Sequence, residues 1–292
     1  MQDLYQRVTE KIISQLETGQ PLPWIKPWKT TSEPFPVNAK TTRPYRGINV
    51  LMLQLEAQSR GFCRNRWVTY RQAQELGGQV RKGAKGSPVI LYRPLEPSAS
   101  SVPLTERDPL QSNDKRAVMR TFSVFNIEEV DGLQESSQPT PVADGWPPVM
   151  IAEGIFYDSG ASFRYGGDRA FYRPKDDSIQ LPEKQAFRSR EDFYSTALHE
   201  LVHWTGHRSR CDRPFGQAYA DDVYAMEELI AELGAAFLCA HCQLDGEVQH
   251  TSYVASWLRI LKANNRAIFS AAAKAQVAVD YLLKQIVSLD VV

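Results

Sequence analysis

The segment HELVHWTGH, residues 199–207, limits what this chain can be more than any other stretch of it. Apolar side chains around it recur every three or four residues, which predicts an amphipathic helix. His199 and His203 would then lie one turn apart on one face, where two imidazoles can bind one metal ion. Glu200 lies beside that face and could take a proton from a metal-bound water, so it is the candidate catalytic residue.

Both ends of this helix are marked in the sequence. Ser189 with Asp192 three residues later is a capping-box start, and the charges of Glu191 and Asp192 favour a helix N-terminus. Gly206 is a natural helix stop. The competing interpretation is a pair of core histidines on a buried helix, but Glu200 would then be desolvated without an evident partner.

The third metal ligand is expected on a second helix, in DDVYAMEELIAELGAAFLCAH, residues 221–241. Glu228 and Glu232 share a stripe with small residues on an otherwise apolar helix, and carboxylates so placed need a cation or a hydrogen-bond donor. We assign Glu228 as the ligand and Glu232 as the carboxylate that orients a ligating imidazole, with an exchange of these roles left open. Glu227 is expected to face solvent. A plain surface pair of glutamates is the alternative.

Two histidines and one carboxylate leave a coordination position open for water, which is typical of catalytic metal sites. A three-histidine site is disfavoured, because Ser209 occupies the position that would complete HExxHxxGxxH. His207 is assigned a supporting role, as a hydrogen-bond donor to a ligand or to a developing oxyanion, which Tyr219 or Tyr224 could also fill; a structural histidine is the alternative. The ligand types favour one divalent ion, Zn²⁺ first, and also suit Mn²⁺, Co²⁺ or Ni²⁺.

The net charge of zero conceals an asymmetry along the chain. Residues 1–120 hold 19 Lys and Arg against 10 Asp and Glu, a balance of +9, so the remainder carries −9. A basic half is a candidate for a polyanionic partner, although it can also be a merely solvated surface.

Aromatic side chains among cations favour single-stranded DNA as that partner. In PLPWIKPWKT, residues 21–30, the prolines forbid a helix and hold two tryptophans beside two lysines on an extended segment that suits base stacking. Each tryptophan could equally be a core residue. A basic turn at 45–49 that opens a helix at 49–59 could receive a phosphate. The candidate contacts are Trp24, Lys26, Trp28, Lys29, Tyr45, Arg46, Asn49, Arg66, Trp67, Lys82, Lys85 and Phe122.

The remaining stretches complete the layout. Residues 2–19 predict a helix, 88–92 and 116–127 predict strands, and 131–146 have the composition of a linker. A short helix and strands then lead into the HELVH helix, as in zinc-dependent peptidases, whose edge strand binds the substrate as an added β-strand. Gly166, Gly167 and the strand at 170–172 are therefore expected to line a cleft.

Compartment and redox state follow from what the sequence contains. It has no signal-like start and no apolar run long enough to span a bilayer, so a cytoplasmic protein without a membrane partner is expected. Four cysteines are too few and too irregularly spaced for a disulfide framework. The lone pair Cys239 and Cys242 is interpreted as small core residues rather than as a zinc knuckle.

Taken together, several segments resemble the ArdC-type antirestriction proteins of conjugative plasmids. The resemblance covers nearly the whole chain and rests on PLPWIKPW, the turn at 45–49, FSVFNIEEV, FYSTALHELVHWTGH, YAMEELIAELGAAF and SWLRILKANNRAIFSAAAKAQVAVDYLL. It implies an N-terminal domain that binds single-stranded DNA and a C-terminal zincin-type metallopeptidase domain, which protect incoming plasmid DNA from host restriction enzymes. It also carries over His199, His203 and Glu228 as metal ligands and Glu200 as the catalytic glutamate.

We therefore expect an α+β fold of two domains: a single-stranded DNA-binding domain at 1–130, a linker at 131–146 and a zincin-like metallopeptidase domain at 147–292. Two functions stay open. In the first, a metallopeptidase is delivered to DNA by the basic domain and acts on a protein substrate linked to restriction. In the second, the protein masks incoming DNA by coating it, and its metal site is structural or vestigial.

Overall fold

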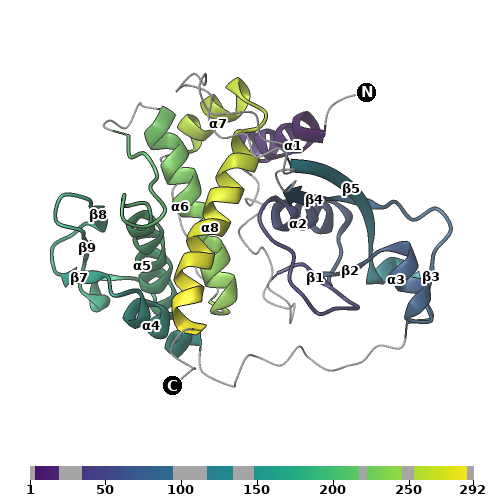
Figure 1. Ribbon diagram of the computed structural model, residues 1–292, viewed down its shortest axis with the longest axis horizontal. Coiled ribbons are helices and arrows are strands. Elements are labelled where there is room, and N and C mark those ends of the chain that lie inside the picture. Colours follow the sequence, from purple (N-terminus) through teal and green to yellow (C-terminus); the bar gives the residue numbers. More distant parts are fainter. Residues whose placement is uncertain are drawn as a thin grey trace, which may run out of the picture.

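The computed structural model describes residues 4–19, 35–94, 117–133, 148–216, 222–244 and 253–287. Helices are mixed with short strands in the first half and predominate in the second, which confirms the α+β class (Figure 1). The elements of the first half are α1 (Leu4–Thr18), β1 (Val37–Asn38), α2 (Ile48–Arg60), β2 (Arg66–Val68), α3 (Tyr70–Glu75), β3 (Gln79–Val80), β4 (Ser87–Pro94), β5 (Ala117–Asn126), a 3₁₀ turn (Ile127–Glu129) and β6 (Val130–Asp131).

The second half carries a small sheet and five helices in its described residues. They are α4 (Pro148–Ser159), β7 (Ser162–Tyr165), β8 (Phe171–Arg173), β9 (Ser178–Leu181), a 3₁₀ turn (Lys184–Ala186), α5 (Arg190–Thr205), α6 (Asp222–His241), α7 (Val254–Ala263) and α8 (Ala267–Val287). None of the helices in the described ranges combines the length and the apolar composition that a membrane crossing requires.

The larger sheet of the first half has the strand order β1-β2-β5-β4. Strand β4 pairs antiparallel with β5 along its whole length, from Ser87 opposite Val124 to Pro94 opposite Ala117. This pairing confirms the strands predicted at 88–92 and 116–127. The short β6 pairs with β3, so the sheet structure reaches Asp131, the first residue of the predicted linker.

One side chain of α2 covers the edge of this sheet at β4. Asn49 Nδ2 donates to the carbonyl of Ile90, and Asn49 Oδ1 accepts from the Ile90 amide, both at 2.8 Å. The carboxamide stands in for a neighbouring strand and satisfies backbone groups that an open edge would leave unpaired. Asn49 is thus corrected from a DNA contact to a clamp on the edge strand, because its polar atoms are used inside the fold.

Trp67 lies in the core under the same sheet. It is 0% exposed, packs with Leu53, Val89 and Val124, and donates its indole N–H to Asn65 Oδ1 at 3.0 Å. A fully covered ring has no face to offer a base, so the prediction that Trp67 contacts DNA is wrong. Its basic neighbours suggested exposure, but adjacent strand residues point to opposite faces of a sheet.

The HELVH helix, α5, begins where the sequence places it. Ser189 Oγ accepts a hydrogen bond from the amide of Asp192 at 3.0 Å and caps the helix. The helix ends at Gly206 as expected, but with φ −72° this glycine does not adopt the left-handed conformation that commonly ends a helix. A Cβ at Gly206 would lie 2.7 Å from Phe215 Cζ and 3.0 Å from Arg213 Nη2, so the glycine is required for space.

The two halves share one hydrophobic core. Buried side chains of α1 and α2, such as Ile12 and Leu51, belong to the same cluster as Leu201 of α5 and Ile268 of α8. In Figure 1, α8 lies between α5 on one side and α1 and α2 on the other. The halves are therefore packed together through helices.

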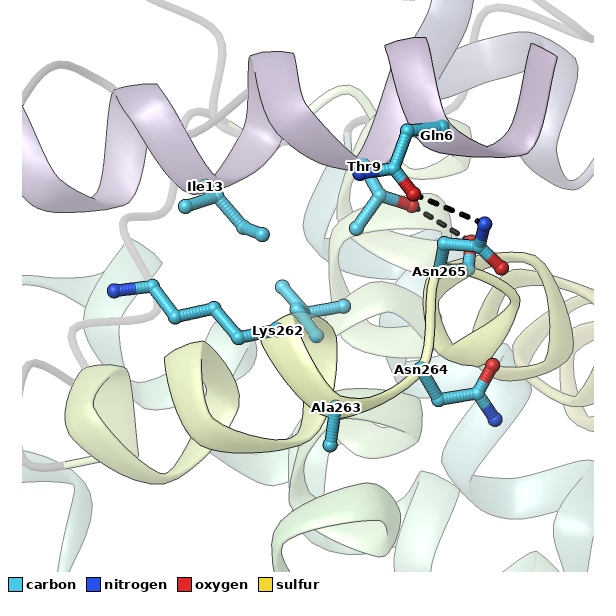
Figure 2. A pocket seen from close by; sticks show the side chains of 8 residues that line it. Gln6, Thr9, Ile13, Lys262, Ala263, Asn264 and Asn265 are labelled. Atoms are coloured by element: carbon cyan, nitrogen blue, oxygen red, sulfur yellow. Dashed lines mark hydrogen bonds between the residues drawn. The ribbon is translucent and has the colours of Figure 1, made fainter. Parts of the chain in front are cut away.

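Polar contacts reinforce this junction. The guanidinium of Arg46 pairs with the carboxylate of Asp280, and the Gly47 amide donates to Gln276 Oε1 at 3.0 Å. A cavity of about 420 Å³ lies between α1 and the turn that joins α7 to α8 (Figure 2). At its rim Thr9 Oγ1 donates to the carbonyl of Asn265 at 2.7 Å.

Candidate metal centre

Helices α5 and α6 pack closely and bring the three expected ligands together. Gly234 of α6 makes this approach possible, since a Cβ there would lie 2.8 Å from Val202 Cγ1 of α5. One donor atom from each of His199, His203 and Glu228 falls within 4.8 Å of the others. The two imidazole Nε2 atoms are 3.1 Å apart, and each lies 3.5 Å from an oxygen of Glu228.

The charges of this buried cluster suit a cation at its centre. Burial alone would lower the pKa of His203, but hydrogen bonds with Glu227 and Glu228 raise it to about 10. Burial alone would raise the pKa of Glu228, but its hydrogen bonds with His199 and His203 hold it well below the usual range. The pocket therefore favours positive charge between these side chains. Two imidazoles and a carboxylate that converge in this way fit a divalent metal ion.

Glu200 is buried beside the cluster, and burial raises its pKa against the charges of His199 and His203. Its carboxylate accepts a hydrogen bond from the backbone of Tyr172 in β8. Strand β8 is an edge of the three-stranded sheet, whose order is β7-β9-β8. The candidate base Glu200 is thus hydrogen-bonded to β8, which contains the strand that we expected along a cleft. The cleft itself stays a prediction.

Glu227 corrects the sequence interpretation. It is 3% exposed rather than solvent-facing, and its Oε1 lies 3.2 Å from His203 Nδ1. Arg213 donates to both of its oxygens, at 2.9 and 2.7 Å. Helix α6 is buried on nearly all sides, so position 227 has no solvent face. A helical projection could have raised this possibility, whereas nothing in the sequence connects Arg213 to the site.

The supporting residues that we expected lie as follows. Glu232 is buried with Oε2 3.9 Å from His199 Nδ1, on the far side of that ring from Glu228, so its orienting role stays a prediction. His207 is half-buried in the turn after α5, where Nδ1 lies 2.8 Å from Ser209 Oγ. Tyr219 lies outside the described residues. The hydroxyl of Tyr224 lies beside the expected third ligand, because it forms hydrogen bonds with Tyr253 and Glu228. Burial and these hydrogen bonds raise the pKa of Tyr224.

The expected DNA contacts divide into three groups. Trp24, Lys26, Trp28 and Lys29 lie outside the described residues. Lys82, Lys85 and Phe122 are exposed, with Phe122 43% exposed on β5. The rest are engaged within the fold: Tyr45 and Arg66 are half-buried, Arg46 pairs with Asp280, and Asn49 and Trp67 are structural, as described above.

Phe122 belongs to a small exposed surface on the β4–β5 pair. Leu91 lies opposite Arg120, and Phe122 lies opposite the buried Val89, so Leu91, Arg120 and Phe122 are on one face of the sheet, next to its buried part. Leu91 is 52% exposed and Arg120 is exposed as well. An aromatic ring with an apolar and a cationic neighbour on a rigid sheet can stack on an unpaired base.

Two helices that present histidines and a glutamate to one point, beside the edge strand of a small sheet, define a zincin-like metallopeptidase domain. The family described as zincin-like metallopeptidase matches residues 150–274, and the family described as the N-terminal domain of anti-restriction factor ArdC matches residues 2–125. The chain belongs to the ArdC family of antirestriction proteins, which confirms the resemblance seen in the sequence.

Solved structures and relatives agree with this assignment. The Mn(II)-bound ArdC protein from the R388 plasmid is 39% identical, with a TM-score of 0.76 and 98% of each chain covered. Its metal-free structure gives a TM-score of 0.77 at 38% identity, over 98% of this chain and 99% of that one. The uncharacterized protein y4eC of Sinorhizobium fredii is 36% identical over 97% of this chain and 92% of its own length.

A longer protein carries a similar stretch. The DNA primase TraC of Escherichia coli is 39% identical over 96% of this chain, but the chain spans only 27% of that primase. The name DNA primase is therefore that of the longer protein.

Proposed function

We propose that this protein protects incoming plasmid DNA from host restriction, that its N-terminal half binds single-stranded DNA, and that its C-terminal half is a metallopeptidase. The observation that carries the proposal is the convergence of His199, His203 and Glu228 within 4.8 Å, with Glu200 buried beside them, in a chain of the ArdC family. The metal is proposed to be one divalent ion, Zn²⁺ first, and the R388 relative has been solved with Mn(II).

Each half contributes a defined part of this activity. A bound divalent ion would polarise a peptide carbonyl and acidify a water molecule. Glu200 is the general base, and burial raises its pKa toward the range in which a carboxylate can take up and release a proton at neutral pH. The Tyr172 amide orients that carboxylate, and the edge strand β8 is proposed to bind the substrate peptide as an added strand.

The DNA-binding surface is proposed on the basic first half. Phe122, Leu91 and Arg120 supply the stacking face, and Lys82 and Lys85 supply cations on the loop that leads into β4. A lysine-bearing loop beside a stacking face provides the salt-sensitive attraction to phosphates that non-specific strand binding requires. The peptidase would thereby be placed near proteins that act on the incoming strand, which is the proposed class of protein substrate.

A second function is favoured by one observation. The side chains of His199, Glu200, His203 and Glu228 are all buried, and a metal ion held among them would also tie α5 to α6 and stabilise the fold. In that case the protein protects DNA by coating it, without peptide cleavage.

The full-length Glu200→Gln variant distinguishes the two functions. Gln keeps the size of Glu but cannot act as a base, so metal and DNA binding should be retained while protection of a conjugating plasmid against restriction is lost. Glu191→Gln, a half-buried residue in the first turn of the same helix, is the matched control and should behave as the wild type. Full protection by Glu200→Gln would exclude peptidase chemistry as the route and favour DNA masking.

A further inference from the structure

We propose that Glu227 is a positioning residue for the metal site, which fixes the ring of His203 through Nδ1, and that Arg213 holds Glu227 in place for this task. The inference rests on the proposed metal site. It assigns a role to two residues that belong neither to the HELVH motif nor to the three expected ligands. Neither side chain would contact the metal ion.

The hydrogen bond to His203 determines which ring nitrogen is available to a metal. Glu227 Oε1 lies 3.2 Å from His203 Nδ1, and an ionised carboxylate can only accept a hydrogen bond. Nδ1 must therefore carry a proton, which leaves the lone pair for a metal on Nε2. That atom faces the centre of the site, 3.1 Å from His199 Nε2 and 3.5 Å from Glu228 Oε1.

Arg213 fixes Glu227 to the helix that carries His203. Its guanidinium donates to both oxygens of Glu227 at 2.9 and 2.7 Å, to Thr205 Oγ1 at 2.9 Å and to the carbonyl of Val202 at 2.8 Å. Both charged side chains are 4% exposed, so the pair is screened from water and geometrically restricted. One arginine thus connects the last turn of α5 to the α6 carboxylate that bonds His203.

Gly206 belongs to the same arrangement. A Cβ at this position would lie 3.0 Å from Arg213 Nη2, the nitrogen that donates to Val202 and to Glu227. The glycine three residues after His203 therefore leaves room for the guanidinium. This accounts for a glycine at a position where the backbone has φ −72° and would accept any residue.

The test is Zn²⁺ affinity, measured by competition with a chromogenic chelator on the full-length protein. A disturbed hydrogen bond behind a ligating histidine typically weakens metal binding about 10–100-fold. We expect this for Glu227→Gln, because the neutral amide must turn a donor NH2 toward either His203 Nδ1 or Arg213, which both donate to the Glu227 carboxylate. The Nδ1 proton of His203 in the Zn²⁺-loaded protein should also shift in the NMR spectrum. Asp222→Asn is the matched control, because this carboxylate of the same helix is 69% exposed and pairs with Arg259 on the surface.

Wild-type Zn²⁺ affinity in a folded Glu227→Gln variant would reduce the Arg213–Glu227 contact to a structural ion pair and overturn the inference. If Glu227→Gln does not fold, the Zn²⁺ affinity of Arg213→Lys tests the inference instead. Lysine keeps the charge but cannot reach all three partners, so the affinity should again fall, and an unchanged affinity would overturn the proposal. Glu228→Ala tests the metal site separately from the role of Glu227, because undiminished Zn²⁺ binding by that variant would refute the metal site itself.

Discussion

Two helical glycines should respond in opposite directions to the same substitution. Gly154 lies in α4 with nothing within 4 Å of the methyl group that alanine would add, whereas Gly234 lies in α6 against α5. Replacing a glycine inside a helix by alanine favours the folded state by about 1 kcal/mol. Gly154→Ala should therefore raise the free energy of unfolding by about that amount.

At Gly234 the same gain is opposed by a steric clash. The new methyl group would lie 2.8 Å from both γ-carbons of Val202 and 3.4 Å from its Cβ. Val202 is β-branched and buried, so it cannot rotate away at low cost, and overpacking of this kind costs about 1–3 kcal/mol. Gly234→Ala should be less stable than Gly154→Ala by about 1–3 kcal/mol. It should also bind Zn²⁺ more weakly, because the α5–α6 spacing sets the distance from Glu228 to the histidines.

Urea unfolding in the presence of a chelator, followed by circular dichroism, measures both free energies without a contribution from metal. In the double variant Val202→Ala/Gly234→Ala the loss should be smaller than the sum of the losses in the two single variants, since the smaller side chain removes the clash. Equal stabilisation by Gly154→Ala and Gly234→Ala would show that the helices do not approach as closely as described, and the account of the metal site would fail with it.

Two further predictions concern other parts of the chain. Trp67→Phe should lower the free energy of unfolding by about 1–3 kcal/mol, because Asn65 Oδ1 loses its buried donor. Phe122→Ala should change this free energy by less than about 0.5 kcal/mol, because the ring is exposed, but it should weaken the binding of a labelled oligonucleotide, measured by fluorescence anisotropy. At pH 8 a thiol reagent should modify exposed Cys63 in the folded protein but Cys242 only after unfolding, since burial raises the pKa of Cys242 to about 12; fast labelling of Cys242, detected by mass spectrometry, would contradict its core position.

Local signals in the sequence predict much of the metal site. The spacing of His199 and His203 and the cap at Ser189 are properties of a single helix, so they could be predicted. The pairing of Glu227 with Arg213 could not, because it joins α6 to a loop 14 residues earlier in the chain, and only the packing of α5 on α6 brings them together.

The first half was harder to interpret for a related reason. Trp67 and Phe122 are both aromatic strand residues among basic residues, and the strand register places them on the same face of the sheet, but Trp67 is packed against α2 and Phe122 is left exposed. Which residues of a sheet face are covered depends on where the covering helix lies along that face, and a single strand sequence does not specify that position. The same reason explains Asn49, whose carboxamide is engaged only because β4 ends up as an edge strand beside α2.

The common core of the two halves has a consequence for how this unit can spread between genes. A recombination event that separated the first half from the second would expose the apolar faces of α1, α2 and α8, and both products would be prone to aggregate. We therefore expect the pair to be inherited and fused as one cassette. The stretch of TraC that resembles this chain fits that expectation, because it spans 96% of the chain, both halves together, inside a protein several times longer.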